Sequence, residues 1–409
     1  MASQITNASG AAPESVLERL LKTSPALEVW WDSSPLVYQN WANELINQYP
    51  MDKQADITEQ LRRLYDPENP TATLFTGVTT NPPLSLNAMK NDPERWAGWI
   101  ANYQKDHPEA DHEEVFWELY KEIVRLGADA FFPLFESSVY NHGYLSGQVD
   151  PRNCFDGEKM LKQGLELASL RPNVMVKIPG TKEGVAVIRE LTSRGISTNL
   201  TSGFTIPQFV AVAEAVQDGL DMARSRGINL SRWRSVVTDM SARWENAPEF
   251  ANQAKEMGIE LSAEDIRWAG VAKFKKAHQI FREKAYPSKM LICSVRMGPE
   301  MNGSMRCLHL EETAGASAVF TLPPNFLSEL FTKGDHLHFE SRIWEDIPAE
   351  VMQKLQQIPY FKQSYEPYGL TLDEFNSIPA LLSTAKEFSN ATQKMVDFVK
   401  ERMIATQRA

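Results

Sequence analysis

The chain has 409 residues, of which 43% are hydrophobic and 10% aromatic, enough for a large core in one to three domains. Its formal net charge is −11 and it has no basic run, which argues against nucleic-acid binding. Three scattered cysteines, Cys154, Cys293 and Cys307, argue against a disulfide framework or a zinc site and favour a cytoplasmic protein. The sequence also lacks the long apolar stretch that a membrane helix needs.

The chain begins with small and polar residues, 1–14, which we expect to form a flexible tail before a single domain at 15–409. Eight short apolar runs follow, most of them bounded by Gly, Pro or polar residues. Such near-continuous apolar runs are typical of strands that are buried on both faces, as in a parallel sheet. The predicted strands cover residues 27–34, 72–81, 143–151, 173–179, 195–201, 233–240, 289–296 and 316–323.

Segments with helical spacing of apolar residues separate most of these runs, for example at 156–170, 183–194 and 206–227. We expect a helical insertion at 82–127 and a C-terminal helical segment at 331–409 that packs on the barrel. Eight strands alternating with helices favour a (β/α)8 TIM barrel of the α/β class, with an open doubly wound sheet as the alternative.

Polar or charged residues close, or nearly close, most of the predicted strands. They are Asp32, Asn81, Gln148, Lys177, Asn199, Thr201, Thr238, Arg243 and Arg296. In a TIM barrel, chemistry takes place at the carboxyl ends of the strands. Strand ends also carry polar residues merely because they reach the surface, but this explanation is weaker for the whole set than for any one position.

Lys177 stands out because its ammonium would end a buried strand, in the segment NVMVKIPG. Burial lowers the pKa of a lysine, and the neutral amine can attack a carbonyl to form a Schiff base. The alternative is a salt-bridged lysine at a strand end. His336 and His338 lack matching ligands, so we predict no metal site. Motifs of nucleotide-binding loops and hydrolase elbows are absent, and we expect no cofactor.

Six segments, taken together, resemble the transaldolase family, and the resemblance runs from about residue 16 to the C-terminus. The segments are GVTTNPPLSLNAM (77–89), LSGQVDPRNCFD (145–156), VMVKIPGTKEG (174–184), GISTNLTSGFTIPQ (195–208), SVVTDMSARWE (235–245) and LICSVR (291–296). The length and the helical C-terminus resemble the longer bacterial type. The resemblance implies transfer of a dihydroxyacetone unit between sugar phosphates, without cofactor or metal.

The resemblance also implies roles for individual residues. Lys177 would form the Schiff base, and Asp32 would donate and accept the proton at the hydroxyl next to the broken C–C bond. Asn81 and Asn199 would bind the dihydroxyacetone hydroxyls, and Thr201 would hold a catalytic water.

On the same grounds Thr238 would line the pocket. Arg243, together with Arg296, would clamp the phosphate, since guanidinium groups suit bidentate oxyanions.

Three residues depart from the family pattern. Gln148 stands where transaldolases usually have a glutamate that relays protons through water, and an amide cannot take a proton. Fructose-6-phosphate aldolases also have glutamine there but pair it with a tyrosine, where this chain has Met240. Asp239 replaces a usual apolar residue and could alter phosphate binding or recognise an amino or hydroxyl group. A non-standard substrate, an aldolase that releases free dihydroxyacetone and a weakened sugar-phosphate-binding homologue therefore remain alternatives, and the oligomeric state is left open.

Overall fold

The computed structural model describes residues 12–301 and 303–408. Residues 1–11 of the predicted tail lie outside the described residues. The first helix, α1 (Val16–Leu21), begins at a capping box in which Ser15 and Glu18 each bond the other's backbone N–H. Among the described residues, the first helix thus begins at Val16.

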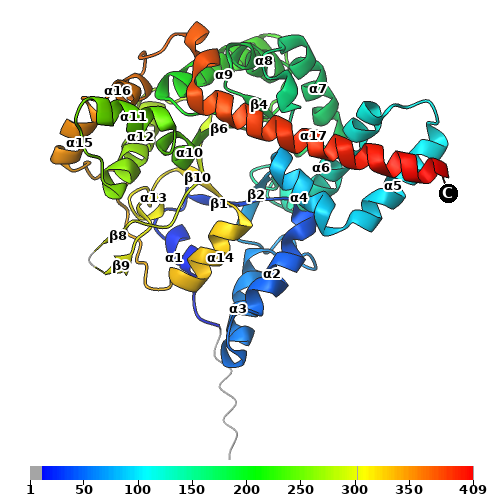
Figure 1. The fold of residues 1–409 in the computed structure, drawn as a ribbon, viewed down its shortest axis with the longest axis horizontal. Coiled ribbons are helices and arrows are strands. Elements are labelled where there is room, and N and C mark those ends of the chain that lie inside the picture. Colours follow the sequence, from blue (N-terminus) through cyan, green and yellow to red (C-terminus); the bar gives the residue numbers. More distant parts are fainter. Residues whose placement is uncertain (1–11, 302, 409) are drawn as a thin grey trace, which may run out of the picture.

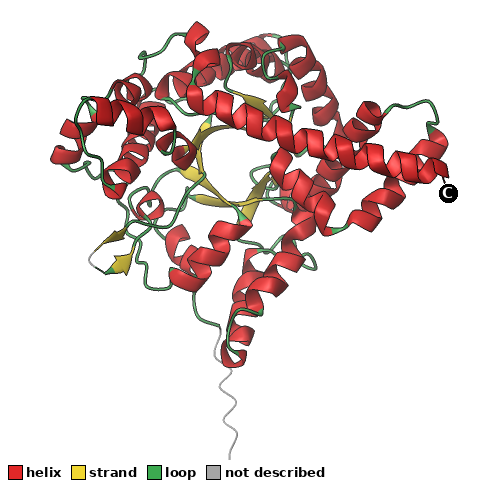
Figure 2. Cartoon of the chain, in the orientation of Figure 1, coloured by secondary structure: helices red, strands yellow, loops and turns green. Residues whose placement is uncertain are grey.

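Eight parallel strands close into a barrel surrounded by helices, which confirms the predicted TIM barrel (Figure 2). Each barrel strand falls inside one of the eight predicted apolar runs. The strands are β1 (Glu28–Asp32), β2 (Phe75–Thr79), β3 (Tyr144–Gln148), β4 (Val174–Pro179), β5 (Thr198–Thr201), β6 (Ser235–Met240), β7 (Lys289–Cys293) and β10 (Ala318–Leu322). The barrel closes where β1 pairs with both β2 and β10.

Helices connect successive strands and cover the outside of the barrel. Those up to the last strand are α2 (Tyr38–Ile46), α3 (Met51–Leu64), α4 (Pro82–Asn91), α5 (Pro93–Asp106), α6 (His112–Ser137), α7 (Gly157–Leu170), α8 (Lys182–Ser193), α9 (Ile206–Ser225), α10 (Ser241–Glu245), α11 (Pro248–Glu256), α12 (Ala263–Glu283) and α13 (Leu308–Glu311). Short 3₁₀ turns η1 (Pro35–Val37) and η2 (Pro151–Asn153) follow β1 and β3. A small antiparallel ribbon, β8 (Glu300–Met301) with β9 (Ser304–Met305), interrupts the connection from β7 to β10.

The segment after β4 shows how the local sequence fixes the geometry around Lys177. Thr181 caps α8 by accepting the N–H of Gly184 at 3.0 Å. A Cβ on Gly184 would lie 1.9 Å from the carbonyl oxygen of Pro179, so only glycine lets the helix approach the strand end this closely. The turn that follows Lys177 is therefore held tightly against the top of its own strand.

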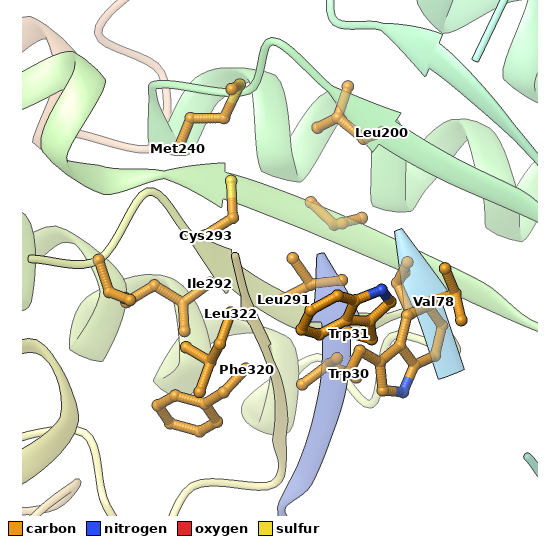
Figure 3. Packing of buried hydrophobic residues seen from close by; sticks show 14 of the residues in the cluster. Trp30, Trp31, Val78, Leu200, Met240, Leu291, Ile292, Cys293, Phe320 and Leu322 are labelled. Carbon is orange, nitrogen blue, oxygen red and sulfur yellow. The ribbon is translucent and has the colours of Figure 1, made fainter. Parts of the chain in front are cut away.

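Side chains alternate between the barrel interior and the helical layer along each strand. Figure 3 shows Ile292, Phe320 and Leu322 gathered on one side of their strands, with Leu291 on the other. Paired residues on neighbouring parallel strands share a face, and Lys177 pairs with Gln148 on β3 and with Asn199 on β5. These three side chains therefore point to the same side of the sheet.

The predicted insertion 82–127 corresponds to α4, α5 and the first half of α6, which continues without a break to Ser137. The predicted C-terminal segment, 331–409, is helical only in part, because residues 334–348 between two helices have no helical structure. Its elements are the end of α14 (Pro324–Lys333), α15 (Ala349–Leu355), α16 (Pro359–Tyr365), the 3₁₀ turn η3 (Leu372–Ser377) and α17 (Pro379–Arg408). The long helix α17 packs against α4, α5 and α6 (Figure 1).

Candidate active site

The Lys177 side chain is almost completely buried, with 5% of the residue exposed, at the carboxyl-terminal end of the barrel. Its Nζ donates a hydrogen bond to the carbonyl oxygen of Thr80 at 2.9 Å. Burial lowers the pKa of Lys177, and the negative charge of Asp32 only partly opposes that shift. The neutral, nucleophilic amine is therefore more favoured in Lys177 than in an exposed lysine.

Asp32 ends β1 and is also buried. Burial raises the pKa of its carboxyl group, although the charges of Lys177 and Arg243 and a hydrogen bond from Thr79 act in the opposite direction. The Thr79 hydroxyl donates to Oδ1 of Asp32 at 2.7 Å. A carboxyl group with a raised pKa is suited to exchange a proton with a substrate.

A cavity of about 180 Å³ opens beside these two residues. Its wall combines the ionisable groups with apolar and hydroxyl side chains from several strand ends. The candidate residues that line it are Asp32, Asn81, Lys177, Thr238, Met240, Arg243 and Arg296. Candidate residues separated by up to 264 positions in the printed sequence thus meet in one pocket, as the barrel topology predicts.

A larger cavity, of about 610 Å³, lies near the amino-terminal ends of β4 and β5, where Val174 and Ser197 contribute to its wall. The residues that line it include Tyr140 and Arg232 but no lysine, carboxylate, cysteine or histidine. It therefore offers no amine for a Schiff base and no carboxylate or imidazole beside one, and we assign the chemistry to the smaller cavity.

Gln148 and Thr201 are buried on the two strands that flank β4. Neither lines the cavity wall. Within the described part of the chain, Oε1 of Gln148 and Oγ1 of Thr201 have no hydrogen-bond partner. Buried polar atoms rarely stay unpaired, so these two oxygens are suited to bind a water or a ligand atom near Lys177.

The two candidate asparagines differ in their contacts. Asn199 is fully buried, donates to the Ser146 hydroxyl at 2.9 Å and accepts from the Thr238 hydroxyl at 2.7 Å. It does not line the cavity, and both ends of its amide are already bonded. Asn81 lines the cavity and caps α4 by accepting the N–H of Leu84 at 3.0 Å. This bond uses its oxygen and leaves its NH2 group as the donor.

Arg243 and Arg296 bring positive charge to the cavity. Glu387 of α17 accepts bonds from both terminal nitrogens of Arg243, at 2.5 and 2.8 Å. Burial and the nearby charges of Arg243 and Arg267 lower the pKa of Arg296. Two guanidinium groups beside a small cavity are suited to bind an anion, although Glu387 already compensates part of the charge of Arg243.

Asp239 does not reach the cavity. It lies between Thr238 and Met240, which both line the wall, so strand alternation turns Asp239 outward toward the helices. There its carboxylate pairs with Lys273 of α12 at 2.6 Å, and neither side chain is exposed. The structure therefore gives Asp239 a buried ion pair in place of the expected substrate contact.

Sequence reasoning did not single out Thr79, Cys293 and Thr321, which also line the cavity. All three have the inward parity of their strands, so alternation counted from Asp32 and Lys177 could have found them. Burial raises the pKa of the Cys293 thiol to about 12, which keeps it protonated and poorly nucleophilic at neutral pH.

Among residues 12–301 and 303–408, no group of three or more His, Cys, Asp or Glu side chains could hold a metal ion. His336 lies in a loop, where Nε2 is 2.6 Å from the carbonyl oxygen of Met305. No helix in the same ranges combines the length and the apolar character that crossing a membrane requires.

Comparison with known proteins identifies the family. A family model described as Transaldolase/Fructose-6-phosphate aldolase matches residues 65–397. The chain belongs to this family. The matched range contains every candidate site residue except Asp32, which precedes it on β1.

Individual transaldolases are similar to the chain at a modest level. A transaldolase of Thiobacillus denitrificans is 32% identical over 277 residues, which cover 63% of this chain and 74% of that protein. One of Saccharopolyspora erythraea is 26% identical over 347 residues, which cover 80% and 87% of the two chains. One of Mycobacterium tuberculosis is 31% identical over 209 residues, 51% of this chain and 55% of its own length. Family membership supports an enzyme of the transaldolase and aldolase class.

Proposed function

We propose that the protein is a Schiff-base transaldolase that moves a dihydroxyacetone unit from a ketose phosphate to an aldose phosphate. The observation that carries the proposal is the buried Lys177 amine beside Asp32 in a cavity that also holds Arg243 and Arg296. Nucleophile, proton carrier and anion clamp are the three parts that this reaction needs.

In the proposed reaction the neutral amine of Lys177 adds to the ketone carbon of the donor, and loss of water forms the Schiff base. Asp32 then accepts the proton of the hydroxyl next to the breaking C–C bond. The bonding electron pair moves into the Schiff base and the aldose phosphate leaves. Addition of the acceptor aldehyde reverses these steps: Asp32 returns the proton, and water releases the product from Lys177.

The remaining residues have binding roles in this proposal. The NH2 group of Asn81 faces the dihydroxyacetone part, and Arg243 with Arg296 holds the phosphate. Gln148 and Thr201 hold the water that enters and leaves during Schiff-base formation, as their unpaired buried oxygens suggest. Asn199 acts indirectly, by fixing the Thr238 hydroxyl that lines the cavity.

Gln148 favours a second candidate, an aldolase that releases free dihydroxyacetone. An amide positions water but cannot carry its proton. The relative rates of hydrolysis and transfer would therefore differ from those with a glutamate at this position. Product analysis with fructose 6-phosphate separates the two reactions. Transfer gives a new ketose phosphate only when erythrose 4-phosphate is present, whereas cleavage gives dihydroxyacetone without an acceptor.

The proposed chemistry is tested by borohydride reduction in the presence of dihydroxyacetone or fructose 6-phosphate, followed by peptide mass spectrometry. We expect a reduced adduct on Lys177 in the wild type and none in Lys177→Ala or Lys177→Arg. Thermal melts check that both variants are folded. An adduct that persists in the folded Lys177→Ala variant would place the nucleophile elsewhere and overturn the mechanism.

A further inference from the structure

Behind the two arginines of the cavity lies a fully buried pair, His309 of α13 and Glu245 of α10. Nε2 of His309 lies 2.6 Å from Oε1 of Glu245, and neither side chain is exposed. On the other side of the ring, Nδ1 of His309 accepts the backbone N–H of Arg296 at 3.1 Å. Neither residue lines the cavity.

The hydrogen bonds fix the protonation of this histidine. A backbone N–H can only donate, so Nδ1 must be the unprotonated nitrogen, and Nε2 carries the proton donated to Glu245. Burial lowers the pKa of His309, although the Glu245 carboxylate opposes the shift, and this agrees with a neutral ring. The ring can therefore form both bonds at once.

The space around Glu245 is shaped for its carboxylate. Arg267 of α12 donates to its second oxygen, Oε2. A Cβ on Gly270, one turn further along α12, would lie 1.9 Å from Oε1, so glycine at this position makes room for the carboxylate. Charged groups are costly to bury unless they are paired in this way, and the site pairs Glu245 on both oxygens.

The pair connects two segments that carry the anion-binding arginines. Glu245 and Arg243 share the five-residue helix α10 after β6, whereas Arg296 follows β7 and is held through its own backbone by His309. We propose that His309 and Glu245 are positioning residues that fix the separation of Arg243 and Arg296, and so set the affinity of the enzyme for the substrate's phosphate. This inference rests on the proposed function.

The connection matters because binding to two guanidinium groups requires a fixed distance between them. The segment after Arg296 leads into the β8–β9 ribbon and not into a long barrel helix, so its position depends on tertiary contacts such as the bond to His309. A displacement of about 1 Å can weaken the effect of a positioned group on the order of 100-fold. A buried histidine that joins both segments supplies that support.

The test compares phosphorylated and unphosphorylated ligands in His309→Phe, which keeps an aromatic ring but removes both nitrogens. We expect KM for fructose 6-phosphate to rise about 10–100-fold, with a smaller change in kcat. The rate of borohydride trapping with dihydroxyacetone, which has no phosphate, should stay within about threefold of the wild type, since misplacing only the arginines costs little of that interaction. His309→Asn, whose oxygen can still accept the Arg296 N–H, should recover part of the phosphate affinity.

Gly270→Ala gives an independent variant, because it displaces the Glu245 carboxylate without changing the histidine or either arginine. It should weaken phosphate binding in the same direction. Equal losses with both ligands, or an unchanged KM for fructose 6-phosphate in folded His309→Phe, would overturn the inference. Titration of inorganic phosphate into each variant reports on the clamp even if the wild type forms no adduct, so failure of the proposed chemistry and failure of the positioning role remain distinguishable.

Discussion

Strand β1 carries two carboxylates into the barrel, Glu28 at its start and Asp32 at its end. Both are buried and both have an arginine among the charges that act on them. Their pKa values nevertheless shift in opposite directions, downward for Glu28 and upward for Asp32. The two ends of one strand therefore show that the partners of a buried carboxyl group decide whether its pKa is lowered or raised.

At the amino-terminal end, Glu28 is surrounded by donors. Arg234 lies 2.5 Å and Lys289 2.7 Å from Oε1, and the indole of Trp30 donates to Oε2 at 3.1 Å. Burial alone would raise the Glu28 pKa, but His142, whose Nδ1 lies 3.6 Å from Oε2, and the charges of Arg234 and Lys289 outweigh it and hold the pKa well below its usual value. This end is an ion network that keeps its charges.

At the carboxyl-terminal end, Asp32 and Lys177 face one cavity, and each is bonded to a neutral group instead of to the other. Thr79 bonds Asp32, and a backbone carbonyl bonds Lys177. Burial then dominates and moves both pKa values toward the neutral forms. Incomplete pairing leaves these groups free to exchange protons, which is what the proposed reaction requires.

The largest expected effect comes from Asp32→Asn. Removal of the proton carrier should lower the rate of C–C bond cleavage by about 10²–10⁴-fold, measured as turnover of fructose 6-phosphate with erythrose 4-phosphate. The free energy of unfolding should stay the same or rise by about 0.5–2 kcal/mol, as is common when a strained functional group is removed.

The stability gain of Asp32→Asn should depend on pH in a defined direction. Because the folded-state pKa of Asp32 is raised, its ionised form destabilises the fold, and this cost is present at neutral pH. The gain should shrink as pH falls through the raised folded pKa and vanish below the unfolded value, about 3.9. A loss of stability at neutral pH would show that Asp32 is paired like Glu28.

Glu28→Gln should have the opposite effect on stability and on its pH dependence. It leaves the charges of Arg234 and Lys289 without their buried partner, which should lower the free energy of unfolding by about 3–5 kcal/mol. The folded-state pKa of Glu28 is lowered, so its contribution exists above about pH 4.3 and is lost as pH falls through that lower value. Denaturant titrations at pH 7 and in acid measure this, and kcat of the folded variant should hardly change.

Arg243 at the carboxyl-terminal end of the barrel and Arg234 at the amino-terminal end can be compared in the same way. Arg243→Ala should raise KM for fructose 6-phosphate by about 10–1000-fold, from about 1.5–4 kcal/mol of lost charge-assisted bonding. Trapping with unphosphorylated dihydroxyacetone should suffer far less. Arg234→Ala, at the opposite end, is the matched control and should lower stability while leaving KM alone. Equal losses on both donors in Arg243→Ala would make Arg243 structural.

The smallest expected effect concerns Gln148. A carboxylate next to Lys177 can relay protons through water, so Gln148→Glu should raise transaldolase turnover at least about tenfold, a modest share of what general acid–base catalysis supplies. Steady-state rates with fructose 6-phosphate and erythrose 4-phosphate measure the gain. An efficient wild type whose rate the variant leaves unchanged or reduces would mean that the natural substrate supplies this group itself.

The sequence predicted the barrel well because each strand is a short apolar run, and such runs are recognisable without knowledge of their neighbours. It also placed Asp32, Lys177 and Arg243 at one end of the barrel, because the topology brings the carboxyl ends of all strands together. Contacts between distant segments could not be predicted in the same way. Nothing in the sequence around Glu28 indicates Arg234 or Lys289, and nothing near Arg243 indicates Glu387.

The orientation of side chains within a strand follows from alternation along the strand. Thr238 and Met240 face the cavity, so Asp239 must face away, and its partner Lys273 lies on a helix that periodicity marks only as amphipathic. The bonds of Asn199 to Ser146 and Thr238 depend on distances across three strands. The irregular segment at 334–348 escaped prediction because its apolar residues pack on the barrel without helical order.

The central claim is that burial keeps Lys177 available as a neutral amine, and the pH dependence of borohydride trapping with dihydroxyacetone tests it most directly. We expect a midpoint for Lys177 adduct formation below about 10.4, the ordinary pKa of lysine. Asp32→Asn should lower the midpoint further, since the charge of Asp32 raises the Lys177 pKa, whereas Glu28→Gln should leave it unchanged. A wild-type midpoint at or above about 10.4 would show that burial does not favour the neutral amine of Lys177.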